Sequence, residues 1–280
     1  MTIWGGNFVV AKVGLSEFPP LLMMGLRFLL VAALLLPFVA VPRGRFGGIL
    51  LLSTILGAVH FPLMFCGMQG LDASTASVAG QLQVPFSSLV AALVLKDRLG
   101  WRRGAGMIVA FAGVLLIAGE PRLLDNPAPL LLVVAASVAF AFATIQIKRL
   151  ETVDGFALNA WMALFAAPQL ILLSLLFERD HMAAVRNATL WGWGAVAYMV
   201  VMTTVVAYSV WYRLLRLYKV NQTVPYLLLQ PVVGVLAGVL LLGEALSWRL
   251  VLGGAVTIAG LSVIVLRRPK LVNGKVTSMT

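Results

Sequence analysis

Asp97–Arg102, which reads DRLGWR, recurs as Glu244–Arg249, which reads EALSWR, at an offset of 147 residues (97 to 244). Further pairs keep the same offset: Gly106 and Gly253, Gly113 and Gly260, Leu82-Gln83 and Leu229-Gln230, and Ser74 and Asn221. The amino-terminal parts match less closely, since Trp4–Lys12 resembles Phe140–Lys148 at an offset of 136 (4 to 140). A shared register of this kind indicates duplication. We therefore expect two copies of one unit, at 1–120 and 127–267, followed by a polar tail at 268–280.

The composition indicates that both units lie in a membrane. Apolar residues make up 61% of the 280 residues and charged residues 11%, whereas a soluble domain carries about 25% charged residues. Since a spanning helix needs about 20 mostly apolar residues, we expect an all-α protein with ten spans, at 1–15, 19–41, 46–69, 73–95, 101–119, 127–149, 155–177, 190–212, 219–242 and 248–267. The first span reaches only about 22 Å, but it lacks the basic leader and cleavage site of a signal peptide.

Lysine and arginine are concentrated in alternate connections between the expected spans. One set of connections holds fifteen: Arg43, Arg45, Lys96, Arg98, Arg102, Arg103, Lys148, Arg149, Arg213, Arg216, Lys219, Arg267, Arg268, Lys270 and Lys275. The other set holds four: Arg122, Arg179, Arg186 and Arg249. Because cytoplasmic loops retain basic residues, we expect both termini in the cytoplasm. The net charge of +11 then reflects topology, and we expect the lipid bilayer rather than nucleic acid as partner.

The number of spans in each unit determines how the two units are related. Five crossings are an odd number, so the second unit enters the membrane from the opposite side to the first. Two such inverted halves are typical of transporters, whose substrate site lies near the midplane between the halves. A duplication that only enlarges a helical bundle is the alternative.

Several short motifs carry a family resemblance. They are Trp4–Val9 (WGGNFV) with Lys12, Phe18–Pro20 (FPP), Leu26–Phe28 (LRF), and the acid-x-x-x-Trp hinges Asp97–Trp101 and Glu244–Trp248. With these motifs the whole chain resembles the EamA-type members of the drug/metabolite transporter superfamily. The resemblance implies ten helices, with the fifth and tenth outside a cavity formed by the other eight, and export of small metabolites. Within the family, the chain is most similar to bacterial exporters of aromatic amino acids, which implies the inner membrane.

Acidic residues are absent from the middle of the expected spans. All ten lie at span ends or in connections: Glu17, Asp72, Asp97, Glu120, Asp125, Glu151, Asp154, Glu178, Asp180 and Glu244. Ionisable groups inside a bilayer are costly and mark function. Proton antiport through a membrane carboxylate is therefore disfavoured, and so is the binding of cationic drugs. The first span offers Asn7 but no acid.

Three basic or titratable residues remain within the spans. Arg27 could attract a substrate carboxylate, or it could snorkel or bind helix-end carbonyls as a packing residue. Lys12 lies nearer a helix end and snorkels more easily. His60 could carry a proton or bond to a neighbouring helix, since its unperturbed pKa is about 6.5.

Neutral polar residues at mid-span suit a zwitterionic substrate. Gln83 and Gln230 occupy equivalent repeat positions, and Ala76, Gly80 and Ser87 share the face of Gln83 at helical spacing. This stripe could line a cavity or form a packing seam between helices. Gln81 is expected to point about 160° away from Gln83 on a helix of ~3.6 residues per turn.

Aromatic residues and prolines complete the candidate site. Trp161 and Tyr208 are the aromatic residues expected to bind substrate; Trp4, Phe140 and Trp211 are further candidates, whereas the tryptophans at span ends fit an interfacial belt. Pro85 and Pro231 each remove a backbone hydrogen bond beside the central glutamines and are expected to act as kinks or hinges.

These patterns predict a monomeric transporter that exports large neutral or aromatic amino acids by alternating access, without a cofactor or metal. Other cargoes remain open: a nucleobase, a small amino acid such as threonine, or a sugar derivative. A membrane enzyme is disfavoured because His60 has no membrane acid beside it, and a purely structural scaffold would not need matched polar residues. The single Cys66 excludes an intramolecular disulfide.

Overall fold

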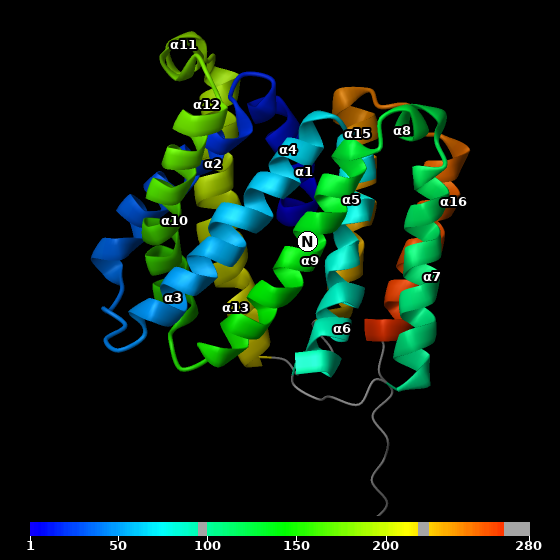
Figure 1. The fold of residues 1–280 in the computed structure, drawn as a ribbon, viewed down its shortest axis with the longest axis horizontal. Coiled ribbons are helices and arrows are strands. Elements are labelled where there is room, and N and C mark those ends of the chain that lie inside the picture. Colours follow the sequence, from blue (N-terminus) through cyan, green and yellow to red (C-terminus); the bar gives the residue numbers. More distant parts are fainter. Residues whose placement is uncertain (95–99, 218–223, 266–280) are drawn as a thin grey trace, which may run out of the picture.

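A computed structural model describes residues 1–94, 100–217 and 224–265, and every regular element in these ranges is helical (Figure 1). The first half contains α1 (Thr2–Leu15), α2 (Pro20–Leu35) with η1 (Leu36–Phe38), α3 (Phe46–Leu52) with η2 (Ser53–His60) and α4 (Phe61–Gln69), α5 (Ala73–Ala79) with η3 (Gly80–Leu82) and α6 (Gln83–Val94), and α7 (Trp101–Ala118). The second half contains α8 (Pro121–Asp125), α9 (Ala128–Arg149), α10 (Gly155–Phe177), α11 (His181–Asn187), α12 (Leu190–Tyr198) with η4 (Met199–Val206) and α13 (Ala207–Leu217), η5 (Val224–Leu228) with α15 (Leu229–Leu242), and α16 (Trp248–Val265). Asp97, Asn221 and the expected tail at 268–280 lie outside the described residues.

The lengths and composition of these helices make the chain a multi-pass membrane protein. Eight helices in the described ranges are long and apolar enough to cross a bilayer: Pro20–Phe38, Phe46–Gln69, Ala73–Val94, Trp101–Ala118, Ala128–Arg149, Gly155–Phe177, Leu190–Trp211 and Trp248–Val265. Large apolar side chains such as Ile108, Leu115 and Leu240 are more than two-thirds exposed on the outside of the bundle, where lipid would cover them. Two further apolar helices are shorter: α1, with 14 residues, and Tyr226–Leu242.

Five connections gather at one end of the bundle, here called the clamped end: residues 15–20, 69–73, 118–128, 177–190 and 242–248. Hydrogen bonds join them to one another, as between Glu17 and Thr189 and between Glu244 and Ala73. Because α1 ends at the clamped end and α9 begins there, these two helices run in opposite directions. The other end of the bundle, where α6 and α13 end, is here called the open end (Figure 1).

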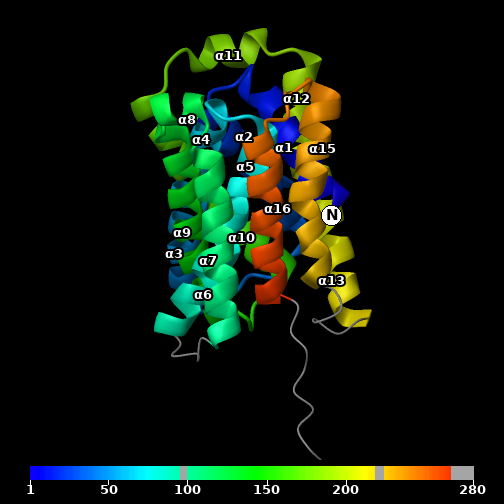
Figure 2. The same cartoon turned by 90° about the vertical axis from the view of Figure 1, so that its right-hand side faces the viewer.

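Helices of the two halves pack together in matched pairs. α2 packs against α10 at one edge, and α7 packs against α16 at the other (Figures 1 and 2). The contact between α6 and α9 is matched by the contact between α15 and α1. Irregular turns are matched too, since η2 and η4 are both π-helical, and η3 and η5 are both 3₁₀ segments that precede α6 and α15.

Glycines allow α7 and α16 to approach at backbone distance. A Cβ atom on Gly106 would lie 2.7 Å from the carbonyl oxygen of Gly260, and one on Gly260 would lie 2.6 Å from that of Gly106. Gly113 and Gly253 face each other in the same way. Close approach of this kind is how small residues join membrane helices, so these four glycines form a seam that serves packing within the chain.

This seam gives a stability prediction with a control on the same helix. We expect Gly260→Ala to lower the melting temperature in detergent, because overpacking costs about 1–3 kcal/mol. Gly254→Ala should leave stability unchanged or raise it, since its Cβ would meet only Val78, at 3.6 Å, and alanine favours the helix. Equal melting temperatures for the two variants would show that α7 and α16 are not held by this seam.

Candidate functional site

One cavity of about 720 Å³ lies among the helices of both halves. Six of the seven residues that the sequence suggested as substrate-binding line it: Asn7, Arg27, His60, Gln83, Tyr208 and Gln230. They come from α1, α2, η2, α6, α13 and α15, so both halves contribute to the wall. The cavity extends toward the open end, because Ala92, Arg103 and Val265 also line it. Such a concave space with a few polar groups is the usual form of a small-molecule site.

The cavity wall is largely aromatic and apolar. Its rings and thioethers are Trp4, Phe8, Phe61, Met64, Phe65, Met68, Phe140, Tyr208 and Trp211. Trp4 packs edge-on against Tyr208 and Trp211, with ring centroids 5.5 Å and 5.7 Å apart. A wall of this kind suits a ligand with an apolar or aromatic side chain.

Amide side chains supply the polar part of the wall. Gln81, Gln83 and Gln230 line the cavity, and their side chains make no hydrogen bond within the described residues. Asn7 accepts a hydrogen bond from the Thr203 hydroxyl through Oδ1, at 3.0 Å. An amide both donates and accepts, so free amides can bind either a carboxylate or an ammonium group.

The placement of Gln81 corrects the expectation that it would point away from Gln83. Both residues line the cavity, because the helix tightens into the 3₁₀ segment Gly80–Leu82 at this point and the angle between successive side chains changes. This change of helix type is caused by Pro85, two residues after Gln83. Pro85 has no N–H to donate to the carbonyl oxygen of Gln81, so the regular helix cannot continue through the site. Pro231 follows η5 in the same way, and both prolines are buried.

Two titratable side chains in the wall have different surroundings. His60 is buried, and its Nδ1 lies 2.8 Å from the Ala136 carbonyl oxygen. This contact requires the proton on Nδ1 and leaves Nε2 as an acceptor. Arg27 is 6% exposed, and its guanidinium lies beside the rings of Phe28 and Phe61, with 5.6 Å and 5.3 Å to their centroids. Among the described residues that line the cavity, none is a carboxylate.

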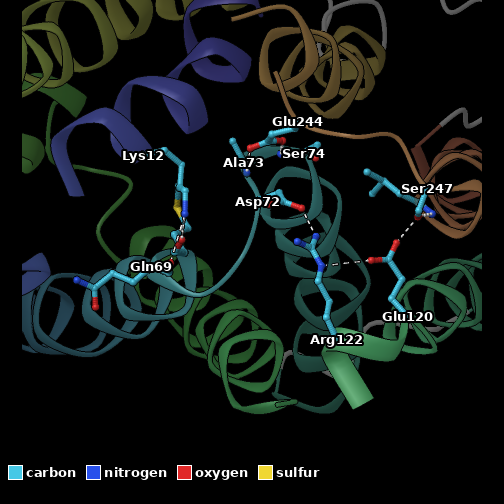
Figure 3. Close-up of polar contacts among 11 residues, drawn as sticks. Lys12, Gln69, Asp72, Ala73, Ser74, Glu120, Arg122, Glu244 and Ser247 are labelled. Carbon is cyan, nitrogen blue, oxygen red and sulfur yellow. Dashed lines mark hydrogen bonds and ion pairs between the residues drawn. The ribbon is translucent and has the colours of Figure 1, made fainter. Parts of the chain in front are cut away.

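Carboxylates are found instead at the clamped end (Figure 3). Glu244 accepts hydrogen bonds from the backbone N–H groups of Ala73 and Ser74, at 2.6 Å and 2.9 Å. It therefore caps the first turn of α5, which belongs to the other half. A carboxylate at a helix N-terminus satisfies free N–H groups and the helix dipole together.

Arg122 links two further carboxylates in the same view (Figure 3). Its guanidinium contacts Asp72 and lies 3.6 Å from Glu120, while the Ser247 hydroxyl donates to Glu120. The hydrogen bond to Asp72 raises the pKa of Arg122 above its ordinary value. Lys12 also joins this end, since its Nζ donates to the carbonyl oxygens of Met68 and Gln69.

Two more carboxylates bridge the halves nearby. Glu17 accepts hydrogen bonds from the backbone N–H and the hydroxyl of Thr189, both at 2.6 Å. Glu178 caps α2 by accepting from the N–H groups of Leu21 and Leu22, at 2.8 Å and 2.9 Å. Together with Glu244, these contacts fasten one half to the other on the side away from the open end.

Comparison with known proteins identifies the kind of molecule to which this cavity belongs. The sequence model of the EamA-like transporter family matches residues 1–119 and again residues 128–266. The chain belongs to the EamA-like transporter family. This EamA-like chain is 33% identical to a protein of Salmonella typhimurium named "Probable amino-acid metabolite efflux pump", over 98% of this chain and 96% of the relative. It is 30% identical to the Escherichia coli K12 protein of the same name, over 94% and 91%.

One solved crystal structure shares the fold of this EamA-like chain. It aligns with 94% of this chain and 95% of its own chain at a TM-score of 0.62 and 20% sequence identity. The family places the chain among transporters rather than enzymes.

Trp161 is the suggested site residue that does not line the cavity of this EamA-like transporter. Its Nε1 donates to the carbonyl oxygen of Ala40, at 3.1 Å, and its ring packs against Phe46. α10 begins at Gly155 at the open end, so Trp161 lies less than two turns inside the helix. We leave it out of the proposed site.

Sequence reasoning also missed features of the EamA-like site. Thr144 and Thr203 line the cavity, but threonine inside a membrane helix commonly bonds to its own helix and gives no functional signal. The π-helical segments that contain His60 and Thr203 had no sequence signal either. π-Helical turns are frequent at functional sites, and here both lie beside the cavity.

Proposed function

We propose that this chain exports amino acids across the bacterial inner membrane, with aromatic or large neutral side chains preferred. The observation that supports this most strongly is the cavity, which combines three unpaired glutamine amides with an aromatic wall. The two relatives named as probable amino-acid metabolite efflux pumps also support export as the direction of transport and amino-acid compounds as the cargo. The amides would bind the polar groups of the cargo, and the rings near Trp4 would contact its side chain.

The mechanism that we propose is alternating access between inverted halves. The two family matches and the opposite directions of α1 and α9 support an inverted repeat of five spans each, with α1 and η5–α15 as the shorter spans. The basic connections face the open end, so that end is assigned to the cytoplasm together with both termini. The clamped end then faces the periplasm, and the described conformation takes up cargo from the cytoplasm.

Export is proposed to follow the cargo gradient rather than proton exchange on a membrane carboxylate. No described residue that lines the cavity is acidic, and Asp97 lies outside the described residues. A monomer would suffice, since both walls of the cavity come from one chain and the α7–α16 seam is occupied within it.

Counterflow in proteoliposomes tests this function. We expect vesicles that hold unlabelled phenylalanine to accumulate labelled phenylalanine. The double variant Gln83→Ala/Gln230→Ala should reduce the initial rate of this uptake by about tenfold, as expected for lost hydrogen bonds of ~1.5 kcal/mol. Gln69→Ala removes the same group from an exposed position and should behave like wild type.

The same assay, repeated with other labelled compounds, separates the alternatives. Counterflow of a nucleobase, threonine or a sugar derivative, but not of phenylalanine or tryptophan, would change the cargo and keep the transporter. An absence of flux for every compound would favour a membrane enzyme or a scaffold.

A further inference from the structure

Arg27 lies in a membrane helix, and no carboxylate among the described residues forms an ion pair with it. It is the eighth residue of α2, and its side chain is 94% removed from the surface (6% exposed). Its Nη1 lies 4.0 Å from the Met24 sulfur, and its Nε has no hydrogen-bond partner in the described part of the chain. An unpaired charge at membrane depth is costly and is expected to serve a function.

Snorkelling to a helix end does not account for these contacts. Helix-end carbonyls, which would satisfy a structural arginine, bind Lys12 instead, through Met68 and Gln69. The end of α2 nearest to Arg27 is the clamped end, where Glu178 and Glu17 close the surface. Nε itself is buried, but the Arg27 side chain lines the cavity, so the charge of the guanidinium acts on a ligand bound there.

The remainder of the cavity wall makes this charge a basis for selectivity. Arg27 and Arg103 line the cavity, and none of the described lining residues is acidic. A carboxylate would therefore meet a guanidinium, which binds it in the bidentate geometry that carboxylates favour. An ammonium group would meet neutral acceptors, such as the amide oxygens and Nε2 of His60, but no carboxylate among the described lining residues, and the faces of Phe28 and Phe61 are already taken by the guanidinium.

We propose that Arg27 binds the carboxylate of the cargo and that the cavity selects net-anionic carboxylates, that is, amino acids whose amino group has been acylated or removed, over zwitterions. This inference rests on the proposed export function and narrows its substrate class. A neutral or cationic derivative without a carboxylate is excluded. Because the transported species carries one negative charge, the membrane potential drives it outward.

Three compounds with the same side chain test the inference in proteoliposomes: N-acetyl-L-phenylalanine, L-phenylalanine and L-phenylalaninamide. We expect N-acetylphenylalanine to be transported about tenfold faster than phenylalanine, and the amide not above protein-free vesicles. A potential of about 100 mV, negative on the side of the open end, should raise the outward accumulation of the anion about 50-fold and leave phenylalanine unchanged.

Variants of Arg27 connect this selectivity to the residue. R27Q should lower N-acetylphenylalanine transport at least tenfold, while R27K should keep part of it because the charge remains. Arg149→Gln removes an exposed arginine that does not line the cavity and should match wild type. Binding of N-acetylphenylalanine to the detergent-solubilised protein gives a readout that does not depend on transport, and R27Q should abolish it.

The outcomes separate this inference from the function on which it rests. Equal transport of all three compounds, or equal N-acetylphenylalanine transport and binding by wild type and R27Q, overturns the inference and leaves amino-acid export standing. No transport of any compound, with N-acetylphenylalanine binding that depends on Arg27, overturns the export function and supports the site. No transport of any compound, with equal N-acetylphenylalanine binding by wild type and R27Q, overturns both the export function and the inference about Arg27.

Discussion

Glu244→Ala is expected to open the clamped end of the protein, the end that we propose faces the periplasm. The carboxylate holds two backbone N–H groups of α5 from the opposite half, and hydrogen bonds to a charged group contribute about 1.5–3 kcal/mol. These bonds join the two halves in the described conformation, and separating the halves at this end would break them. Their loss should therefore shift the equilibrium toward the opened conformation by roughly 10- to 100-fold, since each ~1.4 kcal/mol is a factor of ten.

Cysteine labelling measures this shift directly. Cys66→Ser removes the single native thiol, and Ser87→Cys then places a reporter on the cavity wall. A membrane-impermeant maleimide added from the periplasmic side should label this cysteine slowly in the parent and at least tenfold faster in Glu244→Ala. Glu244→Gln keeps one acceptor oxygen and should give an intermediate rate.

A second carboxylate at the same end provides the control. Asp125 is exposed and makes no hydrogen bond or ion pair in the described structure, so Asp125→Asn should label like the parent. Labelling from the cytoplasmic side should not exceed the parental rate in a folded variant, because unfolding would expose the cysteine to both sides. If Glu244→Ala also labels at the parental rate from the periplasm, closure does not depend on this cap, and Arg122 with Asp72 becomes the better candidate.

The positions of the eight long apolar helices follow from the sequence, because a bilayer requires long apolar runs and these are visible as such. The polar residues of the cavity follow from a related argument. Gln83, Gln230 and Asn7 stand out in spans where a polar side chain is costly, and all three line the cavity. A polar group inside a membrane helix therefore carries information that the same group in a soluble helix would not.

The direction in which an aromatic residue points does not follow from the sequence. Lipid and an apolar cavity both favour apolar side chains, so the hydrophobic periodicity that orients a soluble helix is absent. Trp161 and Tyr208 were therefore equivalent candidates, although only Tyr208 lines the cavity. The contacts that hold the clamped end closed cannot be predicted from the sequence, for a different reason. Glu244 and Glu178 bind backbone N–H groups of distant helices, and such partners have no residue-type signature.

Gly80→Leu is expected to block transport while the protein remains folded. A Cβ on Gly80 would point toward the cavity side chains of Met64 and Phe8, at 3.4 Å and 3.8 Å. The backbone has φ of −60° there, which leucine adopts readily, and leucine favours a helix over glycine by about 0.8 kcal/mol. The added side chain thus takes up space between α1 and α4 without straining the chain. Counterflow should fall at least tenfold with an unchanged melting temperature.

Two further variants separate the effect of the size of the added side chain from the effect of its position. Gly80→Ala adds one methyl group and should retain most of the counterflow, because its Cβ makes only ordinary or slightly close contacts with flexible side chains. Gly47→Leu adds the same leucine where nothing lies within 4 Å of the new Cβ, and it should transport like wild type. Wild-type counterflow in Gly80→Leu would mean that cargo does not pass this wall. The pathway would then have to avoid Gln81 as well, since Gln81 adjoins Gly80 in the 3₁₀ turn.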